Sequence, residues 1–270
     1  MGIKAVDGIG LADVQAVYSG PEGDLWELLM GEQIHIGGMT SSLDLADRAG
    51  IVAGMRGVDL CCCSGAGMRF LVRFRGVAAM TGVDATAKVV ERGRMRNQIQ
   101  GLADCIDFVL GDACTTGLPD ARADFVWGED AWCYVVDKPV LVAEAVRLVR
   151  PGGVVAFTDW VDGPTGLEAD EAEHLLRFMK FPNIQSLPGY VTLLKTAGLE
   201  VEDAHDTGRF APCVELYRNM VGTQLTYDAL RTIGFDQDLL AAIGTDMAFM
   251  QELANQGRII QALFVARKPA

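Results

Sequence analysis

Residues 57–67 constrain this chain more than any other stretch, because an apolar strand there runs directly into a turn of small residues. The segment reads GVDLCCCSGAG. A turn of this kind lets backbone amide groups close on a nucleotide or cofactor at the start of the next helix. By itself the pattern is a weak signal, since strand-to-glycine turns are also common as plain structure. It makes a nucleotide-binding α/β fold the first hypothesis, which the segments that follow can test.

Further strand-like segments follow, and the first two of them end in a carboxylate. Residues 78–84 read AAMTGVD, which places Asp84 about 20 residues after the first turn, where an acid that binds a ribose diol is expected. Residues 106–113 read IDFVLGDA, and Asp112 can accept a hydrogen bond from an adenine amino group. Strand-like segments at 123–130 and 154–158 flank a helix-like run at 140–149. This alternation implies a parallel sheet whose ligand lies at the carboxyl ends of the strands.

The ordered set of segments resembles the class I S-adenosylmethionine-dependent methyltransferases over residues 50–160. The set comprises Asp59 to Gly67, Val83-Asp84, Gly111-Asp112-Ala113 and Arg150-Pro151-Gly152-Gly153. A nicotinamide-dependent dehydrogenase would share the first turn and the acid at the end of the second strand, but binding of its cofactor does not require the last two segments. The resemblance implies a Rossmann-like α/β fold with helices on both faces of a mostly parallel sheet and an antiparallel final strand. It also implies S-adenosylmethionine as the cofactor and S-adenosylhomocysteine as its product.

On this resemblance, the cofactor-binding residues lie at the strand ends and in the first turn. They are Asp59, Cys61, Cys63, Gly65, Gly67, Asp84, Ala85, Asp112, Ala113 and Glu129. The family usually has glycine where this chain has Cys61 and Cys63. We therefore expect two β-carbons either to crowd the methionine part of the cofactor or to force the turn into ordinary dihedral angles. The retained Gly65 and Gly67 favour continued binding.

The N-terminal segment resembles the entry region of the sarcosine/dimethylglycine N-methyltransferases and their small-molecule relatives. The likeness lies in residues 17–24 (VYSGPEGD) and 31–38 (GEQIHIGG), with support from 127–134 and 157–160. It implies a helical lid over residues 1–50, with a flexible break at Gly37-Gly38 before a helix at 43–53. A methyltransferase domain then covers 51–270, with a substrate-covering insertion at 161–189.

The remaining segments continue the α/β pattern toward the end of the sequence. We expect a helix over 190–197 ended by Gly198, a strand over 199–205 and a last strand over 258–266. Helices within 213–257 would pack beside that last strand. The resemblance implies that the last two strands form an antiparallel hairpin at the edge of the sheet.

Two residues are the candidates for catalysis. His35 can orient the acceptor or take its proton, and it can equally be a packed and hydrogen-bonded lid residue. Glu129 follows the fourth strand, where a carboxylate can receive a proton from an amine or hold its ammonium group. The neighbouring Asp130 is a substrate-binding candidate with the same chemistry, or else the N-cap of the next helix.

The other substrate-binding candidates are mostly aromatic. Trp132, Tyr134 and Trp160 can form a wall that binds a methylated ammonium through cation–π attraction, although core packing explains each of them as well. Tyr18 is a further candidate, and Arg209 is a candidate for binding a substrate carboxylate.

Composition excludes several classes of partner. A net charge of −13 argues against nucleic acid, and the one basic cluster, Arg92, Arg94 and Arg96, is expected on a solvated helix face. Neither an apolar leader nor a run long enough to span a bilayer is present, so we expect a cytoplasmic protein without a membrane partner. A homodimer stays open.

The seven cysteines fit buried thiols in a reducing compartment. Three adjacent cysteines do not favour a metal site, because neighbours along a strand point to opposite faces. We expect no metal.

The function that follows is methyl transfer to a small-molecule acceptor, with an amine nitrogen first and an oxygen or carbon atom as the alternative. An S-adenosylmethionine-binding protein with a different reaction, or a regulatory module without catalysis, is a further alternative. A nicotinamide oxidoreductase is the last one.

Overall fold

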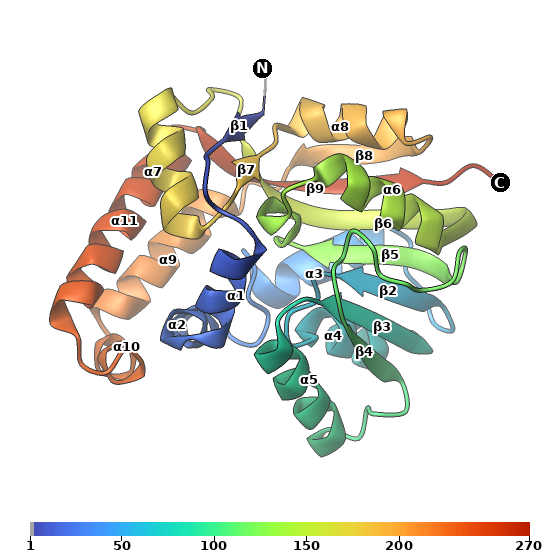
Figure 1. Ribbon diagram of the computed structural model, residues 1–270, viewed down its shortest axis with the longest axis horizontal. Helices are drawn as coiled ribbons and strands as arrows, with labels where there is room; N and C mark the ends of the chain where they lie inside the picture. Colours follow the sequence, from blue (N-terminus) through green and yellow to red (C-terminus); the bar gives the residue numbers. More distant parts are fainter. Residues whose placement is uncertain (1–2) are drawn as a thin grey trace.

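The computed structural model describes residues 3–270 and contains a seven-stranded sheet with a group of helices beyond the carboxyl ends of its central strands (Figure 1). The strands are β2 (Arg56–Leu60), β3 (Ala79–Asp84), β4 (Ile106–Leu110), β5 (Ala123–Glu129), β6 (Val149–Asp162), β8 (Glu200–Asp206) and β9 (Ile259–Arg267). Their order in the sheet is β4-β3-β2-β5-β6-β9-β8. Only β9 runs antiparallel to its neighbours β6 and β8. The expected α/β fold with an antiparallel final strand is confirmed.

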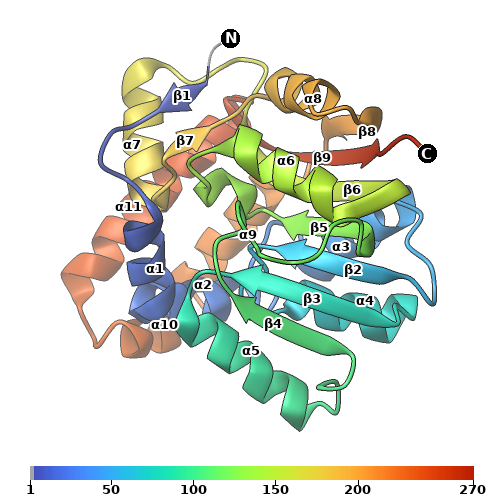
Figure 2. The ribbon, with the colours of Figure 1, turned by 45° about the vertical axis from the view of Figure 1, so that its right-hand side comes forward.

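Helices cover both faces of the sheet, because its strands carry apolar residues on both sides. On one face lie α3 (Gly38–Arg48), α4 (Ala66–Arg75) and α5 (Ala87–Ile99), and on the other lie α6 (Lys138–Leu148) and α8 (Leu187–Thr196) (Figure 2). In β5, Phe125 and Trp127 pack in the first layer and Val126 packs in the second. This alternation along one strand gives the sheet a buried core on each side.

A third group of helices, which we call the helical cap, lies beyond the strand ends (Figures 1 and 2). It consists of α1 (Leu11–Ser19), α2 (Pro21–Met30), α7 (Ala169–Met179), α9 (Phe210–Gly222), α10 (Thr226–Thr232) and α11 (Gln237–Asn255). Side chains from these helices share one hydrophobic cluster, in which Trp26, Leu176, Tyr217 and Met250 are buried. Trp160, near the carboxyl end of β6, packs in the same cluster, so the cap is continuous with the sheet there.

Short elements complete the chain. Strand β1 (Lys4–Ala5) pairs antiparallel with β7 (Asn183–Ile184), and the Lys4 ammonium donates to the Leu167 carbonyl at 2.8 Å. A 3-10 turn, η1 (Trp132–Tyr134), follows β5. The N-terminal segment and residues 161–189 are therefore held together next to the cap.

One expectation about helix boundaries was wrong. The helix expected at 43–53 is α3, which begins at Gly38 and ends at Arg48, because Gly37 caps it at φ 83° and the left-handed Gly50 (φ 64°) stops its continuation. The helices within 213–257 do pack beside β9 as expected, and in the cap they also pack against one another and against α2 and α7.

The expected solvated basic face is also wrong for two of its three arginines. Arg92 and Arg96 of α5 contact α2 of the cap: the Arg92 guanidinium lies 2.5 Å from Asp24 and 2.7 Å from Glu27, and Arg96 also pairs with Glu27. Arg94 donates to the Phe108 carbonyl at 2.7 Å. Arg92 and Arg96 therefore link α2 of the cap to α5, a helix that covers the sheet.

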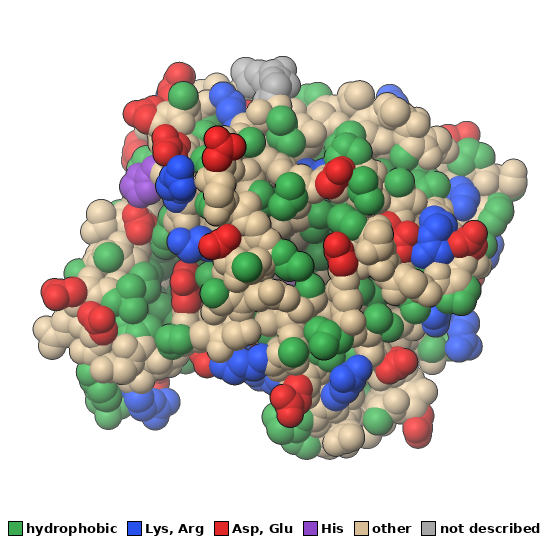
Figure 3. Space-filling view, viewed as in Figure 1, with side chains coloured by type: hydrophobic (Ala, Val, Ile, Leu, Met, Phe, Trp, Pro, Cys, Tyr) green, Lys and Arg blue, Asp and Glu red, His purple; other side chains and the backbone are tan. Residues whose placement is uncertain are grey.

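The surface carries charges of both signs. On the face in Figure 3, Lys and Arg side chains are scattered among acidic ones, in a protein with a net charge of −13. Across residues 3–270, no helix combines the length and the apolar character that crossing a membrane requires. In the same range, no three His, Cys, Asp or Glu side chains are grouped closely enough to hold a metal ion.

Candidate active site

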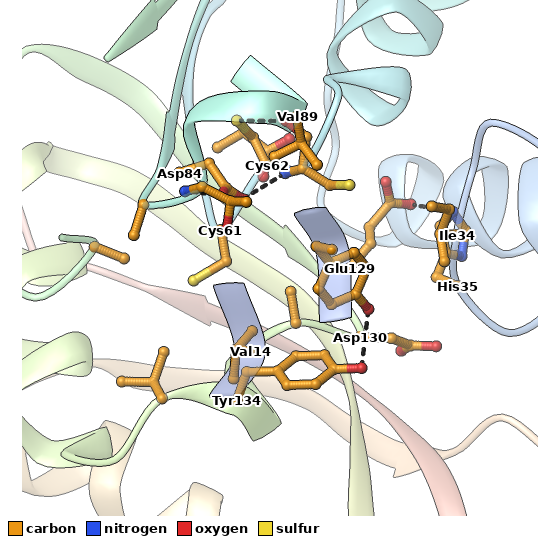
Figure 4. A pocket seen from close by; sticks show the side chains of 18 of the residues that line it. Val14, Ile34, His35, Cys61, Cys62, Asp84, Val89, Glu129, Asp130 and Tyr134 are labelled. Atoms are coloured by element: carbon orange, nitrogen blue, oxygen red, sulfur yellow. Dashed lines mark hydrogen bonds and ion pairs between the residues drawn. The ribbon is translucent and has the colours of Figure 1, made fainter. Parts of the chain in front are cut away.

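A cavity of about 350 Å³ lies between the carboxyl ends of β2–β5 and the first helix of the cap. Asp59, Asp84 and Glu129 reach it from the strand ends, and Tyr18 reaches it from α1. Figure 4 shows Asp84 and the cysteine turn at one end of this cavity, with Glu129, His35 and Tyr134 farther along it. Because parallel strands end at the same edge of the sheet, side chains distant in sequence converge here.

The turn between β2 and α4 keeps a glycine-like backbone although it holds cysteines. Cys61 has φ 63° and Cys63 has φ 48°, both left-handed. The Cys61 and Cys62 amides donate to the Val83 carbonyl at 2.9 and 3.1 Å, which ties the turn to the end of β3. The expectation that the β-carbons would force ordinary dihedral angles is therefore wrong. The Cys61 and Cys63 side chains line the cavity instead, and burial raises the pKa of the Cys63 thiol to about 12, so this thiol is neutral near pH 7.

Asp84 is held in place by backbone amides. One carboxylate oxygen accepts from Cys63 N–H at 2.9 Å and the other accepts from Thr86 N–H at 2.8 Å. Burial nevertheless raises the pKa of Asp84, and the two hydrogen bonds from backbone amides oppose that shift. Since each oxygen has a further lone pair, the carboxylate can still accept hydrogen bonds from a ligand.

Asp59 has a different environment. It is 4% exposed, it lines the cavity, and no side chain or amide among residues 3–270 donates a hydrogen bond to its carboxylate. Burial raises its pKa, and the nearby Glu129 and Asp84 raise it further. A buried acid with these neighbours favours a cationic ligand group.

Gly67 and Gly65 have separate roles. Gly67 lines the cavity in the first turn of α4, and a β-carbon there would collide with the Glu129 carboxylate. Gly65 caps α4 at φ 77°, lies outside the cavity, and has no space for a β-carbon next to the Phe108 ring. The start of α4 can therefore approach Glu129 only because glycine is present.

The other predicted cofactor residues also line the cavity. Ala85, Asp112 and Ala113 line it at the ends of β3 and β4. Asp112 accepts from Cys114 N–H at 2.8 Å. This fixes the loop that follows β4.

His35 and Glu129 form a buried pair at the other end. His35 Nε2 lies 3.4 Å from Glu129 Oε1. Ser42 of α3 bridges them, with its hydroxyl 2.6 Å from Glu129 Oε1 and 3.2 Å from His35 Nε2. Gln33 in turn donates to the Ser42 hydroxyl at 3.0 Å. Ser42 and Gln33 were missed from the sequence, where the one available signal was a serine at a helix position that the spacing to Leu45 marks as buried.

Asp130 also lines the cavity, but its carboxylate is already occupied by protein donors. Ile36 N–H donates to Oδ2 at 2.8 Å, and the Gln261 amide donates to both oxygens at 2.8 and 2.9 Å. Asp130 itself adopts φ 50°. It is not the N-cap of the following turn, since Ala131 holds that position. Burial raises the pKa of Asp130, and the nearby His35 and these donors oppose the shift.

Tyr18 and Tyr134 meet across the cavity. Their hydroxyl groups are 2.9 Å apart, and their rings are perpendicular with centroids 5.6 Å apart. Burial raises the pKa of both phenols, so both stay protonated at neutral pH. One hydroxyl donates to the other, which leaves a hydroxyl hydrogen and free lone pairs for a ligand.

Three predicted substrate residues lie away from this cavity. Trp132 stacks on Phe157 at 4.0 Å in the layer of α6 and α8. Trp160 packs perpendicular to Phe181 and Phe210 in the cap cluster. The Arg209 guanidinium pairs with Asp44 at 2.6 Å. The expected wall of three aromatic side chains is therefore not formed, and only Tyr134 of that set reaches the cavity.

The cavity is acidic and apolar. Seven of its lining residues are Asp or Glu, and none of the lining residues that the structure describes is Lys or Arg. The seven are Glu32, Asp59, Asp84, Asp112, Glu129, Asp130 and Asp137. Apolar side chains from α1 and from residues 135–140 form the rest of the rim, including Leu11, Val14, Val136 and Val140.

Comparisons with known proteins identify the family. Residues 58–157 match the methyltransferase domain family. The chain is 33% identical over 202 residues to 27-O-demethylrifamycin SV methyltransferase of Amycolatopsis mediterranei. The matched region covers 69% of this chain and 74% of that protein.

Two solved structures share the fold. One, named for a sarcosine dimethylglycine methyltransferase from Galdieria sulphuraria, has a TM-score of 0.77 at 23% identity and covers 90% of this chain and 91% of its own. The other is phosphoethanolamine N-methyltransferase 2 of Haemonchus contortus in complex with phosphomonomethylethanolamine and S-adenosylhomocysteine, with a TM-score of 0.84 at 20% identity over 95% of this chain and 59% of that one. The strand-end carboxylates, the tight turn before α4 and the extended sequence match together show that this chain belongs to the class I S-adenosylmethionine-dependent methyltransferases.

Proposed function

We propose that the chain transfers a methyl group to an amine nitrogen of a small acceptor that carries no negative charge. The observation that carries the proposal is the cavity lining, with seven carboxylates and neither Lys nor Arg among the described lining residues. Apart from the amide groups of the turn and the start of α4, which would bind the cofactor, the described lining has no cationic group to pair with a phosphate or carboxylate of the acceptor. The lining therefore supports an amine acceptor, but one without the carboxylate for which Arg209 was the candidate.

The residues present fit the cofactor. Asp84 would accept hydrogen bonds from the ribose hydroxyls, and Asp112 with Ala113 would bind the adenine. Asp59, buried with no donor of its own, would pair with the ammonium of the methionine part. The turn and the start of α4 would direct amide groups toward the carboxylate of that part. Bound S-adenosylmethionine supplies an electrophilic methyl group on its sulfonium.

Proton transfer would be the task of the His35–Glu129 pair. A protonated amine has no free lone pair, so it must lose a proton before it can attack the methyl carbon. The His35 imidazole, 3.4 Å from Glu129 Oε1, would take that proton, and the Glu129 carboxylate would stabilise the imidazolium. The Tyr18 and Tyr134 hydroxyls would orient the acceptor, and the cap would exclude water from the cavity during methyl transfer.

A second candidate is methyl transfer to a hydroxyl oxygen of a larger apolar acceptor. The rim of the cavity favours it, because Leu11 and Val136 line the cavity and are 48% and 58% exposed. The 33% identical relative is named 27-O-demethylrifamycin SV methyltransferase, a name that refers to an oxygen of that compound. The same His35–Glu129 pair would then take the hydroxyl proton.

Transfer of an isotopically labelled methyl group to matched acceptors tests the proposal. The panel pairs each amine with an analogue that carries a carboxylate or phosphate, and adds phenols and aliphatic alcohols. We expect turnover of the uncharged or cationic amines and little turnover of the anionic analogues. Faster turnover of the anionic member of each pair would refute the proposed acceptor class. His35→Ala and Glu129→Gln should stay folded and lose turnover.

Calorimetric titration with S-adenosylhomocysteine tests the cofactor residues. Asp84→Ala should weaken binding by about 1 to 3 kcal/mol, because a buried acceptor for the ribose hydroxyls is lost. Asp107→Ala is the matched control, since Asp107 is an exposed carboxylate on β4 outside the cavity. A thermal melt of both variants separates lost contacts from a loosened turn. Unchanged affinity in folded Asp84→Ala would exclude the ribose assignment.

A further inference from the structure

Gln261 is a polar side chain in a strand, β9, whose other residues up to Ala266 are apolar and buried. It lies in β9 opposite Trp160 of β6, and none of it is exposed. Its neighbours Ile260 and Ala262 are also buried. A buried amide requires hydrogen-bond partners, so its contacts identify what the side chain is for.

All polar groups of this amide are used. Nε2 has two hydrogens: it donates to the Ile36 carbonyl at 3.0 Å and shares the other between the two Asp130 oxygens at 2.9 and 2.8 Å. The Thr207 hydroxyl donates to Oε1 at 2.8 Å. Since the Ile36 carbonyl can only accept, the amide nitrogen must face Ile36, which fixes the orientation of the side chain.

These contacts hold both sides of one residue in the segment that carries His35. Ile36 N–H donates to Asp130 at 2.8 Å, and the Ile36 carbonyl accepts from Gln261. Asp130 directly follows Glu129, and Ile36 directly follows His35. Gln261 and Asp130 therefore clamp the two segments whose side chains form the His35–Glu129 pair.

We propose that Gln261 is a positioning residue for methyl transfer, which sets the geometry of His35 against Glu129 from behind the cavity wall. The inference rests on the proton-transfer role given to His35 and Glu129 in the proposed function. Gln261 does not line the cavity, so its loss should affect turnover more than cofactor affinity. A wrongly placed catalytic group costs about 100-fold in rate for a displacement of about 1 Å.

The test uses Gln261→Met, which preserves length but removes the donors, and Gln261→Glu, which preserves shape but replaces the donor by an acceptor. The matched control is Gln251→Met: Gln251 is also a buried amide, 6% exposed, in α11, and it donates to the Ala211 carbonyl at 3.1 Å away from the cavity. We expect kcat to fall about 10- to 100-fold in both Gln261 variants, with S-adenosylhomocysteine affinity changed less than about 3-fold. Gln251→Met should retain its kcat.

Two measurements distinguish positioning from general stability. With three histidines in the chain, imidazole resonances can be followed individually in the S-adenosylhomocysteine complex: Gln261→Met should shift His35 and leave His174 and His205 unchanged. In a His35→Ala background, Gln261→Met should lower kcat less than about 3-fold further. If the His35 resonance does not shift, or if Gln261→Met lowers kcat equally in the wild-type and His35→Ala backgrounds, the role of Gln261 is overturned, while the proposed role of His35 still stands. Full turnover in His35→Ala overturns the proposed role of His35 and this inference with it.

Discussion

Cys61 and Cys63 show how a turn can keep its shape without the residue that the shape favours. Their φ angles of 63° and 48° are left-handed. A β-carbon in that region costs about 1 to 2 kcal/mol relative to glycine. The hydrogen bonds that the backbone amides of the turn donate to the Val83 carbonyl and the Asp84 carboxylate stabilise this conformation against that cost.

Cys63→Gly should therefore raise the free energy of unfolding by about 0.5 to 1 kcal/mol, because relief of the left-handed strain exceeds the extra unfolded-state entropy of glycine. Chemical denaturation measures the change. Cys62→Gly is the control: Cys62 is buried near Met68 without a positive φ, so the same substitution there should destabilise the fold. Destabilisation in both variants would mean that Cys63 packing outweighs its strain.

The strand-end carboxylates were predictable, whereas their partners were not. Asp84 and Asp112 each follow an apolar run, and a parallel sheet brings such positions together whatever the rest of the chain does. The Ser42 contact with Glu129 joins residues that are 87 positions apart. Nothing local in α3 indicates that contact, because it depends on how the helix docks against the sheet.

At the next scale, helix α6 supports the loop that carries Asp112 and Ala113. Glu144 of α6 accepts from the Thr116 amide at 2.9 Å and from its hydroxyl at 2.5 Å. Arg147, one turn further, donates to Glu144 and to the Leu118 carbonyl, both at 2.7 Å. The Arg147 guanidinium and the Thr116 donors lower the pKa of Glu144 to about 2.

This shift predicts a pH dependence of stability. A carboxyl whose pKa is lower in the folded state stabilises the fold above its unfolded pKa, and the contribution is lost as the pH falls through the folded pKa. At pH 7 the free energy of unfolding of the wild type should exceed that of Glu144→Gln by about 2 kcal/mol. This difference should disappear as the pH falls from about 4.5 to about 2. Denaturation of both proteins across this range measures the gap. A gap that is independent of pH would assign the difference to packing.

Elements with strong periodicity were predicted well and those between them were not. The central strands β2 to β5 were expected within a few residues of where they lie, since each is a short apolar run bounded by turn residues. Trp132 was expected at the cavity because it follows β5, but the chain leaves the sheet there and the side chain turns toward Phe157. Once a strand ends, the alternation that assigns a side chain to one face no longer applies.

At the scale of the whole molecule, the helical cap is the feature that could not be predicted from the sequence. A lid over residues 1–50 and a covering insertion at 161–189 were expected, yet the cap also contains α9, α10 and α11. Trp26, Leu176 and Met250 pack in one cluster although they come from three distant segments. Periodicity marks each helix as amphipathic without naming its partner, so this assembly follows only from the fold.

The cap is fastened to the sheet through ion pairs between α2 and α5, and this predicts how readily the cavity opens. Glu27 pairs with Arg92 at 2.7 Å and also with Arg96, and these side chains are 16 to 21% exposed. Glu27→Gln removes both pairs and should lower stability by about 1 kcal/mol, which corresponds to roughly 5-fold faster release of S-adenosylhomocysteine in stopped-flow experiments. The effect should shrink at high salt, because screening weakens the pairs in the wild type.

Glu173→Gln is the matched control for this prediction. Glu173 pairs with Arg177 at 3.0 Å on the exposed face of α7, where both side chains are more than half exposed. An exposed pair of this kind contributes less than about 1 kcal/mol, so release should be unchanged. If Glu27→Gln loses stability but releases the product at the wild-type rate, the α2–α5 ion pairs stabilise the fold without controlling the cavity. Ligand exchange would then have to proceed through movement of the loop at residues 31–37, which the Asp130–Gln261 clamp holds at Ile36.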